Sequence, residues 1–581
     1  MPAPEVFPRN ATPPDAHGFP DYRRFAAADR AWARAHEREL RGRRRRRRSA
    51  EALRADLARC LGLRLTRGAP ASAMRVGRGL VRVPGAGWDG ADIVLRLTHP
   101  AGAPRGVALV LSGDALRATL ARAGFIVAVV DLPALRALSM AHNKRRVIEG
   151  SCALGDVVAE AAIAIGAVAQ VHALAPWVVG TDAAATAAIL LAALDGRVAG
   201  VIATTPIELG EAAPYALAIP GIAHVADLTA IAATIAPRPV VIDQPQAALL
   251  RALARATRPA TTAVRFPVPL PPRPRADPAT SSRSLPAWAA AAKRLSAAFV
   301  RLNAMPASAA RCRPLAVRRV GTSRLADATR EEIDVRTGAH TWAKLAFLRP
   351  LGPERRRPTV LCLPGSGDDV ARVESRYAHE VVARGWNAAI IDARVALHPF
   401  YPCIGEGRPA LGQSLDDLRR VLTVVAARSD VDRRRIATFG VSQGGTHAWM
   451  LAAFDRRIAA AAPVCGLTTW TSLFDAPGPG GGSALDGHSP YYYFPGILAH
   501  GDQPDLCALM APRPLMMIGA TRDPWFPLDG MRATARAIRR VYALHRRADA
   551  FRYLEFTGGH SLPQPIRERA YDFLDEAFAA V

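Results

Sequence analysis

An internal repeat limits the possible folds of this chain more than any other feature. Two segments of twenty residues, 220–239 and 495–514, are identical at nine positions, and both end in Ala-Pro-Arg-Pro. Further pairs of segments match in the same order upstream: 107–114 with 359–368, 123–131 with 384–392, and 177–182 with 437–442. Four ordered matches predict a tandem duplication, in which two copies fold as units of the same kind.

A Pro-rich stretch, Pro267–Pro286, separates the two copies. Its prolines exclude a helix or a central strand, so we interpret it as a domain linker. A chain of 581 residues is long enough for two or three cores. We predict a basic, flexible tail over 1–50, a first domain over 51–285 that ends in the linker, and a second domain over 286–581. The first domain should open with a helix, because leucines recur at helical spacing over 51–63.

Within each copy, apolar runs of strand length alternate with amphipathic segments of helix length. This pattern predicts an α/β fold, in which a mostly parallel sheet has helices on both faces. The strands expected in the second copy are 360–363, 388–391, 436–439, 460–464 and 515–518. Ligand sites in such sheets lie at the carboxyl ends of the strands, so catalytic residues are expected in the loops that follow them.

The segment 436–453 has the pattern of a strand, a Gly-x-Ser-x-Gly turn centred on Ser442, and an Ala-rich helix. Small residues allow such a turn to pack tightly and to present the serine hydroxyl at the N-terminus of the helix. A serine hydroxyl becomes nucleophilic only when a base, itself oriented by a third group, takes its proton. The chain should therefore supply an acid after a late strand and a histidine before the last helix.

Asp523 and His560 occupy these two places, between the run at 515–518 and the last predicted helix. Asp529 and Glu555 are alternative acids. Asp523 fits better, because Glu555 falls within a strand-like run and Asp529 near the start of the next helix. Singly, Ser442 could be a turn residue, Asp523 a helix cap and His560 a loop residue. Their order and spacing predict a Ser-Asp-His triad that needs no metal or other cofactor.

An oxyanion formed at the nucleophile needs donors that are already in place. The first expected donor is the N–H of Gln443. The second is expected from the loop at 364–369, as the N–H of either Ser366 or Gly365. The loop at 473–495 could form a wall of the substrate site, or it could pack down on the sheet. The side chains predicted to contact substrate are His488, Tyr491, Tyr492 and Trp525.

Four motifs together resemble the acetyl xylan esterase and dienelactone hydrolase branch of the α/β-hydrolases. They are Gly440–Gly445, Ala511–Pro514, Asp523–Pro527 and Gly558–His560. The resemblance covers most of 310–581 and, in degraded form, 70–270. It implies a metal-free hydrolase of carboxylic esters, acting on an acetylated carbohydrate or another small acyl ester. The His-Gly or Arg-Gly-Gln sequence usual in the oxyanion loop is replaced here by Pro-Gly-Ser.

Alignment of the two copies places Asp182 where the second copy has Ser442. Ala184 replaces the second glycine of the turn, and the positions of the acid and the histidine fall near Ala248 and at Leu270. An aspartate nucleophile would also need a base to activate water. We therefore predict that the first copy is a noncatalytic, degenerate domain.

Two other functions fit parts of this sequence. One is a serine peptidase of the prolyl-oligopeptidase type, although no propeller-like repeats precede the second copy. The other is a binding or scaffold protein in which both copies are vestigial. Hydrolysis of esters that depends on Ser442 would exclude the binding protein, and a panel of peptide substrates would separate the peptidase from the esterase.

The formal charge of +26 comes almost entirely from arginine, since lysine occurs at only three positions. Without an RNA- or DNA-binding motif, this charge indicates a basic surface with no dedicated partner, although the Arg43–Arg48 tract leaves nucleic acid possible. The seven cysteines lack the spacing of a metal site and are expected to be reduced. We expect no membrane-spanning run of about twenty apolar residues and no secretion signal, so the predicted location is the cytoplasm.

Overall fold

A computed structural model gives the fold of the chain between residues 49 and 580. The description leaves out residues 1–48, 67–74, 78, 113–115, 210–214, 245–264, 270–274, 307–311, 339–341, 354, 367, 393–406, 408, 479–481, 486–487, 489–493 and 581. The chain divides into two compact units, with the main division between residues 273 and 274, inside the Pro-rich stretch. The Arg43–Arg48 tract lies outside the described residues.

The first unit is built on an eight-stranded sheet. Its strands, in spatial order, are β2 (Arg75–Gly77), β3 (Leu80–Val83), β4 (Ile93–Thr98), β6 (Phe125–Asp131), β5 (Gly106–Val110), β7 (Pro176–Thr181), β8 (Gly200–Thr204) and β9 (Val240–Ile242). The pairs from β6 to β9 are parallel, and those from β2 to β6 are antiparallel. Every residue of central β5 is buried, as expected for a strand covered on both faces.

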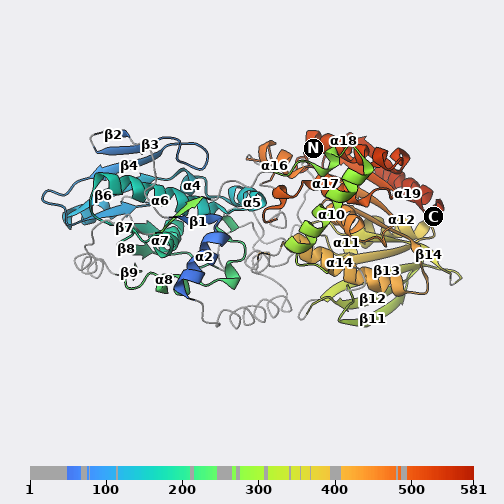
Figure 1. Cartoon of the computed structure of the whole chain (residues 1–581). Coiled ribbons are helices and arrows are strands. Elements are labelled where there is room, and N and C mark those ends of the chain that lie inside the picture. Colours follow the sequence, from blue (N-terminus) through green and yellow to red (C-terminus); the bar gives the residue numbers. More distant parts are fainter. Residues whose placement is uncertain are drawn as a thin grey trace. The chain divides into compact units, whose positions relative to one another are not determined.

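Helices pack against this sheet, among them α6 and α7 (Figure 1). The described helices of this unit are α2 (Ala50–Cys60), α3 (Arg117–Arg122), α4 (Pro133–Arg136), α5 (Met140–Glu149), α6 (Ala153–Val171), α7 (Asp182–Leu194) and α8 (Leu228–Ala233). Leu120 of α3 packs on Ala108 and Val110, which point to one face. Helices α6 and α7 pack on the sheet as well, and both are almost entirely apolar because nearly all their residues are buried.

The second unit contains a nine-stranded sheet. In spatial order its strands are β11 (Ala316–Arg324), β12 (Ala328–Arg336), β13 (Trp342–Pro350), β15 (Asn387–Asp392), β14 (Arg357–Leu363), β16 (Val431–Val441), β17 (Ala460–Val464), β18 (Leu515–Ala520) and β19 (Phe551–Phe556). The pairs from β15 to β19 are parallel, and those from β11 to β15 are antiparallel. All five strands predicted from the sequence lie within strands of this sheet, so the α/β prediction is confirmed.

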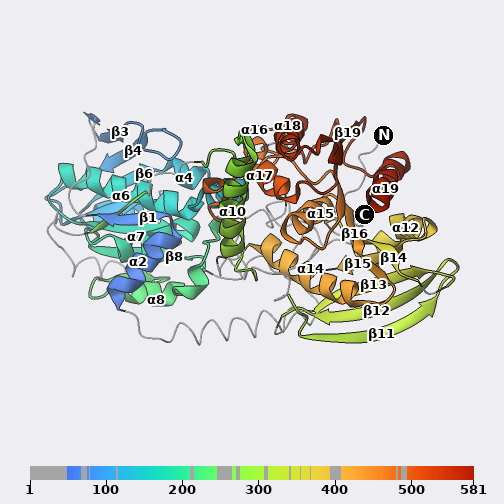
Figure 2. The same cartoon turned by 45° about the vertical axis from the view of Figure 1, so that its right-hand side comes forward.

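Helices lie on both faces of the second sheet, and Figure 2 shows α14 and α15 on one side of the central strands and α12 and α19 on the other. The helices of this unit are α10 (Leu285–Leu302), α11 (Val370–Val373), α12 (His379–Ala383), α14 (Ala410–Ala427), α15 (Gln443–Phe454), α16 (Trp470–Asp475), α17 (Gln503–Cys507), α18 (Leu528–Leu544) and α19 (Gln564–Ala579). On the α12 and α19 side, Val381 and Leu574 share a buried cluster with Phe439 of β16. A parallel sheet shielded in this way leaves its strand ends as the place for a site.

The two sheets have the same strand order, except that the second carries β19 as an extra strand. The arginine of the repeated Ala-Pro-Arg-Pro segment also makes equivalent contacts in each unit. Arg238 donates to three carbonyls at the end of α7 and in the loop that follows, and Arg513 does the same after α15. Each arginine thus binds one carbonyl in the last turn of a buried helix and two in the loop that follows, so the repeated motif has the same structural role twice.

Three further expectations can be compared with the structure. Residues 51–60 of the segment 51–63 lie in α2, but the helix ends at Cys60, three residues earlier than expected, because the chain turns at Gly62 into β1 (Leu63–Thr66). The first prolines of the Pro-rich stretch lie in β10 (Phe266–Pro269), which pairs only with β1 in a separate two-stranded sheet and is not a central strand. The expectation that no segment is long and apolar enough to span a membrane is corrected, because α6 is. However, 78% of its apolar stretch is buried inside the fold.

Candidate active site

Ser442 lies on a sharp turn between β16 and α15, with φ 60° and ψ −126°. This backbone conformation is strained for a residue with a Cβ and costs of order 1–3 kcal/mol, so surrounding packing must hold it. The amide of Ser442 donates to the carbonyl of Val464 on β17 (2.9 Å), and its own carbonyl accepts from the amide of Thr446 (2.9 Å). The neighbouring strand and the first helical turn therefore fix the half-buried serine at the carboxyl edge of the sheet.

Three glycines explain why the chain can form this turn. A Cβ at Gly440 would lie 2.7 Å from the carbonyl oxygen of Leu363, and one at Gly444 would lie 2.1 Å from the same oxygen. A Cβ at Gly445 would lie 2.5 Å from the carbonyl oxygen of Val464. These distances are far shorter than van der Waals contact. Only glycine lets the turn pack this closely against β14 and β17.

The start of α15 and the loop after β14 meet beside Ser442. Gln443, the first residue of α15, is buried, and its side-chain oxygen accepts a hydrogen bond from the hydroxyl of Ser366 (2.7 Å). Since Ser366 follows β14, this contact joins the two segments predicted to supply oxyanion donors. The amide of Gly365 donates to the carboxylate of Asp368 (3.2 Å). Of the two alternatives for the second donor, the Gly365 N–H is therefore already engaged.

Asp523 lies in the loop after β18, and its side chain is fully buried. Its Oδ1 accepts hydrogen bonds from the amides of Trp525 (2.9 Å) and Phe526 (3.1 Å). Its Oδ2 lies 2.8 Å from Nδ1 of His560. These three contacts hold the carboxylate in one orientation, with one oxygen directed at the imidazole.

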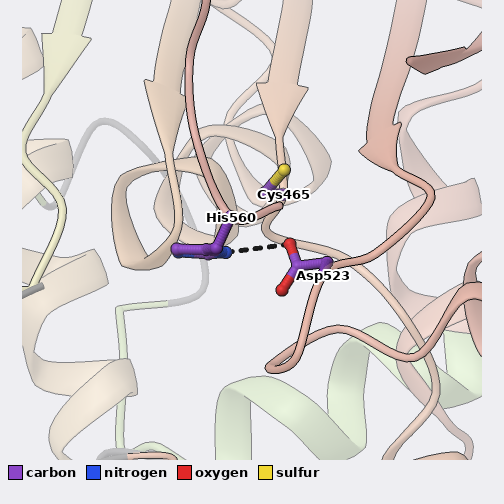
Figure 3. Close-up of side chains that lie close together, drawn as sticks. All are labelled: Cys465, Asp523 and His560. Carbon is purple, nitrogen blue, oxygen red and sulfur yellow. Dashed lines mark hydrogen bonds and ion pairs between the residues drawn. The ribbon is translucent and has the colours of Figure 1, made fainter. Parts of the chain in front are cut away.

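His560 lies in the loop after β19, and Figure 3 shows its ring turned edge-on to Asp523. The Phe526 ring lies parallel to the imidazole, with 5.8 Å between centroids and 5° between planes. When Nδ1–H donates to a carboxylate, the other ring nitrogen, Nε2, carries the lone pair and can accept a proton. The pair therefore has the arrangement of a general base with its orienting acid.

The alternative acids are placed differently. Glu555 on β19 forms a bidentate salt bridge with Arg532, with two hydrogen bonds of 2.8 Å. This salt bridge lowers the pKa of the Glu555 carboxyl. Asp529 is exposed in the first turn of α18. The structure brings Asp523, of these three acids, to the imidazole of His560.

The predicted substrate contacts are only partly described. Tyr491 and Tyr492 lie outside the described residues. His488 is buried, and its Nε2 lies 2.7 Å from the carbonyl oxygen of Trp525. Its ring also meets the Phe526 ring edge-on, with 5.0 Å between centroids. His488 therefore supports the loop that carries Asp523, and the half-buried Trp525 lies on that loop.

A fourth side chain, Cys465, lies against the Asp523 and His560 pair (Figure 3). Burial raises the pKa of its thiol well above the usual value, and the neighbouring Asp523 carboxylate raises it further. Sulfur, carboxylate oxygen and imidazole nitrogen lie within 4.8 Å of one another, and these are atom types that bind Zn²⁺. Here Nδ1 of His560 and Oδ2 of Asp523 are joined by a hydrogen bond, and the Cys465 thiol keeps its proton at neutral pH.

The matching edge of the first unit carries different chemistry. Asp182 has φ 52° at the position that corresponds to Ser442. Its carboxylate accepts a hydrogen bond from the hydroxyl of Thr205 (2.6 Å), whose amide donates to Asp243 (2.5 Å). The positions predicted for an acid and a histidine in this copy, near residues 248 and 270, lie outside the described residues.

Three residues of the site were not identified from the sequence. Asp368, which Arg372 and Arg376 hold in place, engages the Gly365 amide. The short Gly-Ser-Gly-Asp spacing was the only signal for it. Phe526 lies in the Asp523–Pro527 motif, which indicates no separate role for it, and Cys465 lies in an apolar run that is typical of a buried thiol. Only the position of Cys465 directly after a predicted strand could have indicated it.

Similarity to known proteins covers parts of the chain. A family model described as acetyl xylan esterase (AXE1) matches residues 414–469, which include Ser442. The protein named "Putative hydrolase YtaP" from Bacillus subtilis (strain 168) is 27% identical over 257 residues, which is 41% of this chain and 84% of that protein.

Solved structures of esterases resemble about half of the chain. A glucuronoyl esterase from Solibacter usitatus is 16% identical with a TM-score of 0.42, and the match covers 52% of this chain and 97% of that one. An acetyl xylan esterase from Paenibacillus sp. R4 is 18% identical with a TM-score of 0.36, over 48% of this chain and 94% of that one.

Proposed function

We propose that the second unit is a serine-dependent hydrolase of carboxylic esters. The observation that carries this proposal is the hydrogen bond of 2.8 Å between His560 and the buried Asp523. It lies at the same sheet edge as Ser442, which stands on a strained turn at a helix N-terminus. A nucleophile, a base and an orienting acid in this chain order are the parts needed for acyl transfer through an acyl-enzyme.

In the proposed mechanism, Ser442 attacks the ester carbonyl while Nε2 of His560 takes its proton. Asp523 holds the imidazole in the tautomer with the proton on Nδ1 and stabilises the imidazolium that forms. The imidazolium then gives its proton to the leaving alcohol, which leaves the acyl group on Ser442. Water, activated by the same imidazole, hydrolyses the acyl-enzyme and restores the serine.

The oxyanion is assigned to the backbone amides of Gln443 and Ser366. Gln443 follows the nucleophile, and its amide lies in the first turn of α15, where N–H groups have no partner within the helix. Ser366 is preferred to Gly365, because the Gly365 amide already donates to Asp368. The side-chain contact between Ser366 and Gln443 keeps the two donors at a fixed separation.

For the substrate, we propose a small acyl ester, with an acetylated carbohydrate as the first candidate. The match of residues 414–469 to the acetyl xylan esterase model supports this choice, because it spans the nucleophile turn. The similarity to a protein named as a hydrolase supports the reaction class but does not indicate the alcohol. Trp525, together with the loop that carries Tyr491 and Tyr492, is the proposed wall of the substrate site.

We propose that the two units arose by tandem duplication and that the first is a noncatalytic copy. The shared strand order and the matching contacts of Arg238 and Arg513 support the duplication. The carboxylate of Asp182, which occupies the nucleophile position, is bonded to Thr205. The cytoplasm is the proposed location, and no nucleic-acid partner is proposed.

The test is the hydrolysis of short p-nitrophenyl esters by the full chain, its Ser442→Ala variant and a matched Ser375→Ala variant. Ser375 is an exposed serine of the same unit whose hydroxyl donates to a carbonyl of its own helix turn, that of Arg372 (3.0 Å). We expect a loss of about 10⁴-fold or more in kcat for Ser442→Ala and none for Ser375→Ala. Equal rates for the wild type and Ser442→Ala would refute the proposal. A peptide panel in the same assay would identify a peptidase.

A further inference from the structure

Cys465 has a fixed place at the edge of the second sheet. It directly follows β17 and has φ 45°, a left-handed backbone conformation that is uncommon for a residue with a side chain. Its amide donates to the carbonyl of Ile518 on the neighbouring strand β18 (2.9 Å). The backbone is thus held between the strands that lead to Ser442 and Asp523, and the side chain is directed at the site.

The thiol lies within 4.8 Å of the Asp523 carboxylate in a region that is buried from water. Cys465 and the Asp523 side chain are both fully buried, and the thiol lies beside the bond between Asp523 and His560 (Figure 3). In the structure the thiol is directed at the carbonyl oxygen of Ser561, with a hydrogen bond of 3.9 Å from the sulfur, and the Asp523 carboxylate is the second acceptor within reach, at no more than 4.8 Å. A carboxylate is the stronger acceptor of the two, so it should receive the thiol proton.

A count of the acceptor sites of Asp523 leads to the same assignment. A carboxylate has about four lone-pair positions. Two backbone amides and the imidazole account for three of them. In a buried site the protein itself must supply any further donor. Because the thiol pKa is raised well above its usual value, Cys465 keeps its proton at neutral pH and can be that donor.

The first unit offers a parallel at the matching strand end, although the aspartate involved there, Asp182, corresponds to Ser442 and not to Asp523. Thr205 directly follows β8, the strand that matches β17, and it has nearly the same backbone conformation, with φ 48°. Its hydroxyl donates to the carboxylate of Asp182 at 2.6 Å. In each unit, therefore, the residue after this strand places a side-chain donor next to an aspartate. Serine and threonine are thus chemically matched replacements for Cys465.

We propose that Cys465 is a positioning residue, whose thiol donates to Asp523 and keeps the carboxylate turned toward His560. This inference rests on the proposed function, since it gives the thiol a role in the same site. Without the donor, the carboxylate would be less well fixed, which slows catalysis. It would also carry more negative charge toward the imidazole, which stabilises the imidazolium that forms during turnover.

The experiment compares Cys465→Ala, Cys465→Ser and Cys507→Ala with the wild-type chain. Cys507 is a second fully buried free thiol of the same unit, so its variant controls for the loss of any core sulfur. For Cys465→Ala we expect kcat for p-nitrophenyl acetate to fall about 3- to 10-fold, the loss of one buried hydrogen bond, with KM unchanged. The apparent pKa on the rising side of the kcat profile should increase by about half a unit. Cys465→Ser should restore both values to within about twofold.

A second measurement does not need catalysis. The proton shared by His560 and Asp523 gives a low-field nuclear magnetic resonance line, which can be assigned by its loss in His560→Gln. This line should shift in Cys465→Ala and return toward its wild-type position in Cys465→Ser.

The inference is overturned if Cys465→Ala keeps the wild-type rate, pH profile and low-field line. It is also overturned if the serine variant is as impaired as the alanine variant, since the sulfur would then act only through packing. A loss of kcat in Cys507→Ala as large as in Cys465→Ala would also overturn the inference, since the loss of any buried thiol would then have the same effect. Failure of the proposed function can be distinguished from failure of this inference, because the wild type would then show no hydrolysis that depends on Ser442. In that case the low-field line alone would decide whether the thiol donates to Asp523.

Discussion

Replacement of Gly444 by alanine tests the link between the nucleophile turn and the oxyanion loop. The new Cβ would lie 2.1 Å from the carbonyl oxygen of Leu363 and 2.8 Å from that of Pro364. An ordinary C···O contact is about 3.3 Å, so the first pair must separate by about 1.2 Å. Both oxygens belong to the segment that leads into Ser366, and the displacement should therefore move the second oxyanion donor.

The expected effect on rate follows from this displacement. A shift of about 1 Å in a catalytic group costs on the order of 100-fold in rate, and removal of one oxyanion donor costs about 10²- to 10³-fold. We expect kcat for Gly444→Ala to fall by about 100-fold. The free energy of unfolding should fall by about 1–3 kcal/mol, the usual cost of overpacking. The matching residue of the first unit is Ala184, so a methyl group at this place is compatible with the fold.

The assay measures kcat and KM for p-nitrophenyl acetate, together with urea unfolding. Gly321→Ala is the matched control, because a Cβ at this position of β11 would meet no atom within 4 Å. The control should keep the wild-type kcat. A kcat for Gly444→Ala within about threefold of the wild type would refute the reasoning, since the oxyanion loop would then not depend on this close contact.

Three more predictions follow from buried or paired charges. Arg513→Met should lower the free energy of unfolding by about 3 kcal/mol in urea, because it leaves three helix-end carbonyls without their charged donor; an unchanged midpoint would contradict this. Burial lowers the pKa of His447 to about 4, so the unfolded chain binds the proton first and stability should fall by about 3 kcal/mol as pH drops from 6.5 to 4. Urea unfolding at several pH values should show that His447→Gln lacks this loss, and equal losses in both proteins would exclude His447 as the cause. Glu555→Gln should keep kcat within about twofold, whereas Asp523→Asn should lose about 10⁴-fold, and the reverse order would identify Glu555 as the acid.

Much of the fold could be predicted because its signals are local. The strand expected at 460–464 has the same bounds in the structure, since it is a buried apolar run between polar loops. Helix α6 shows the limit of such signals. The composition of α6 fits both a buried core helix and a membrane-spanning helix. Only the structure shows which groups of the fold pair with the charged side chains of Asp156 and Glu160. Glu160 accepts two backbone amides, and Asp156 accepts Arg146.

The candidate site could be predicted only as far as chain order determines it. The sequence favoured Asp523 over Glu555, and the structure places Asp523 against His560. The choice between the amides of Gly365 and Ser366 could not be made, because it depends on where the Asp368 carboxylate lies. The surroundings of Asp523 were missed for a related reason. A cysteine or phenylalanine in an apolar run has the same pattern whether it packs in the core or beside a carboxylate.

The backbone at the sheet edge has a consequence for how such sites can change over time. Ser442 and Cys465 in one unit, and Asp182 and Thr205 in the other, all adopt a positive φ at corresponding strand ends. Under the proposal that the first unit is a noncatalytic copy, strain of this kind has persisted without selection for hydrolysis, so the packing of the sheet edge alone maintains it. A new activity on the first unit would then require new side chains but no new backbone.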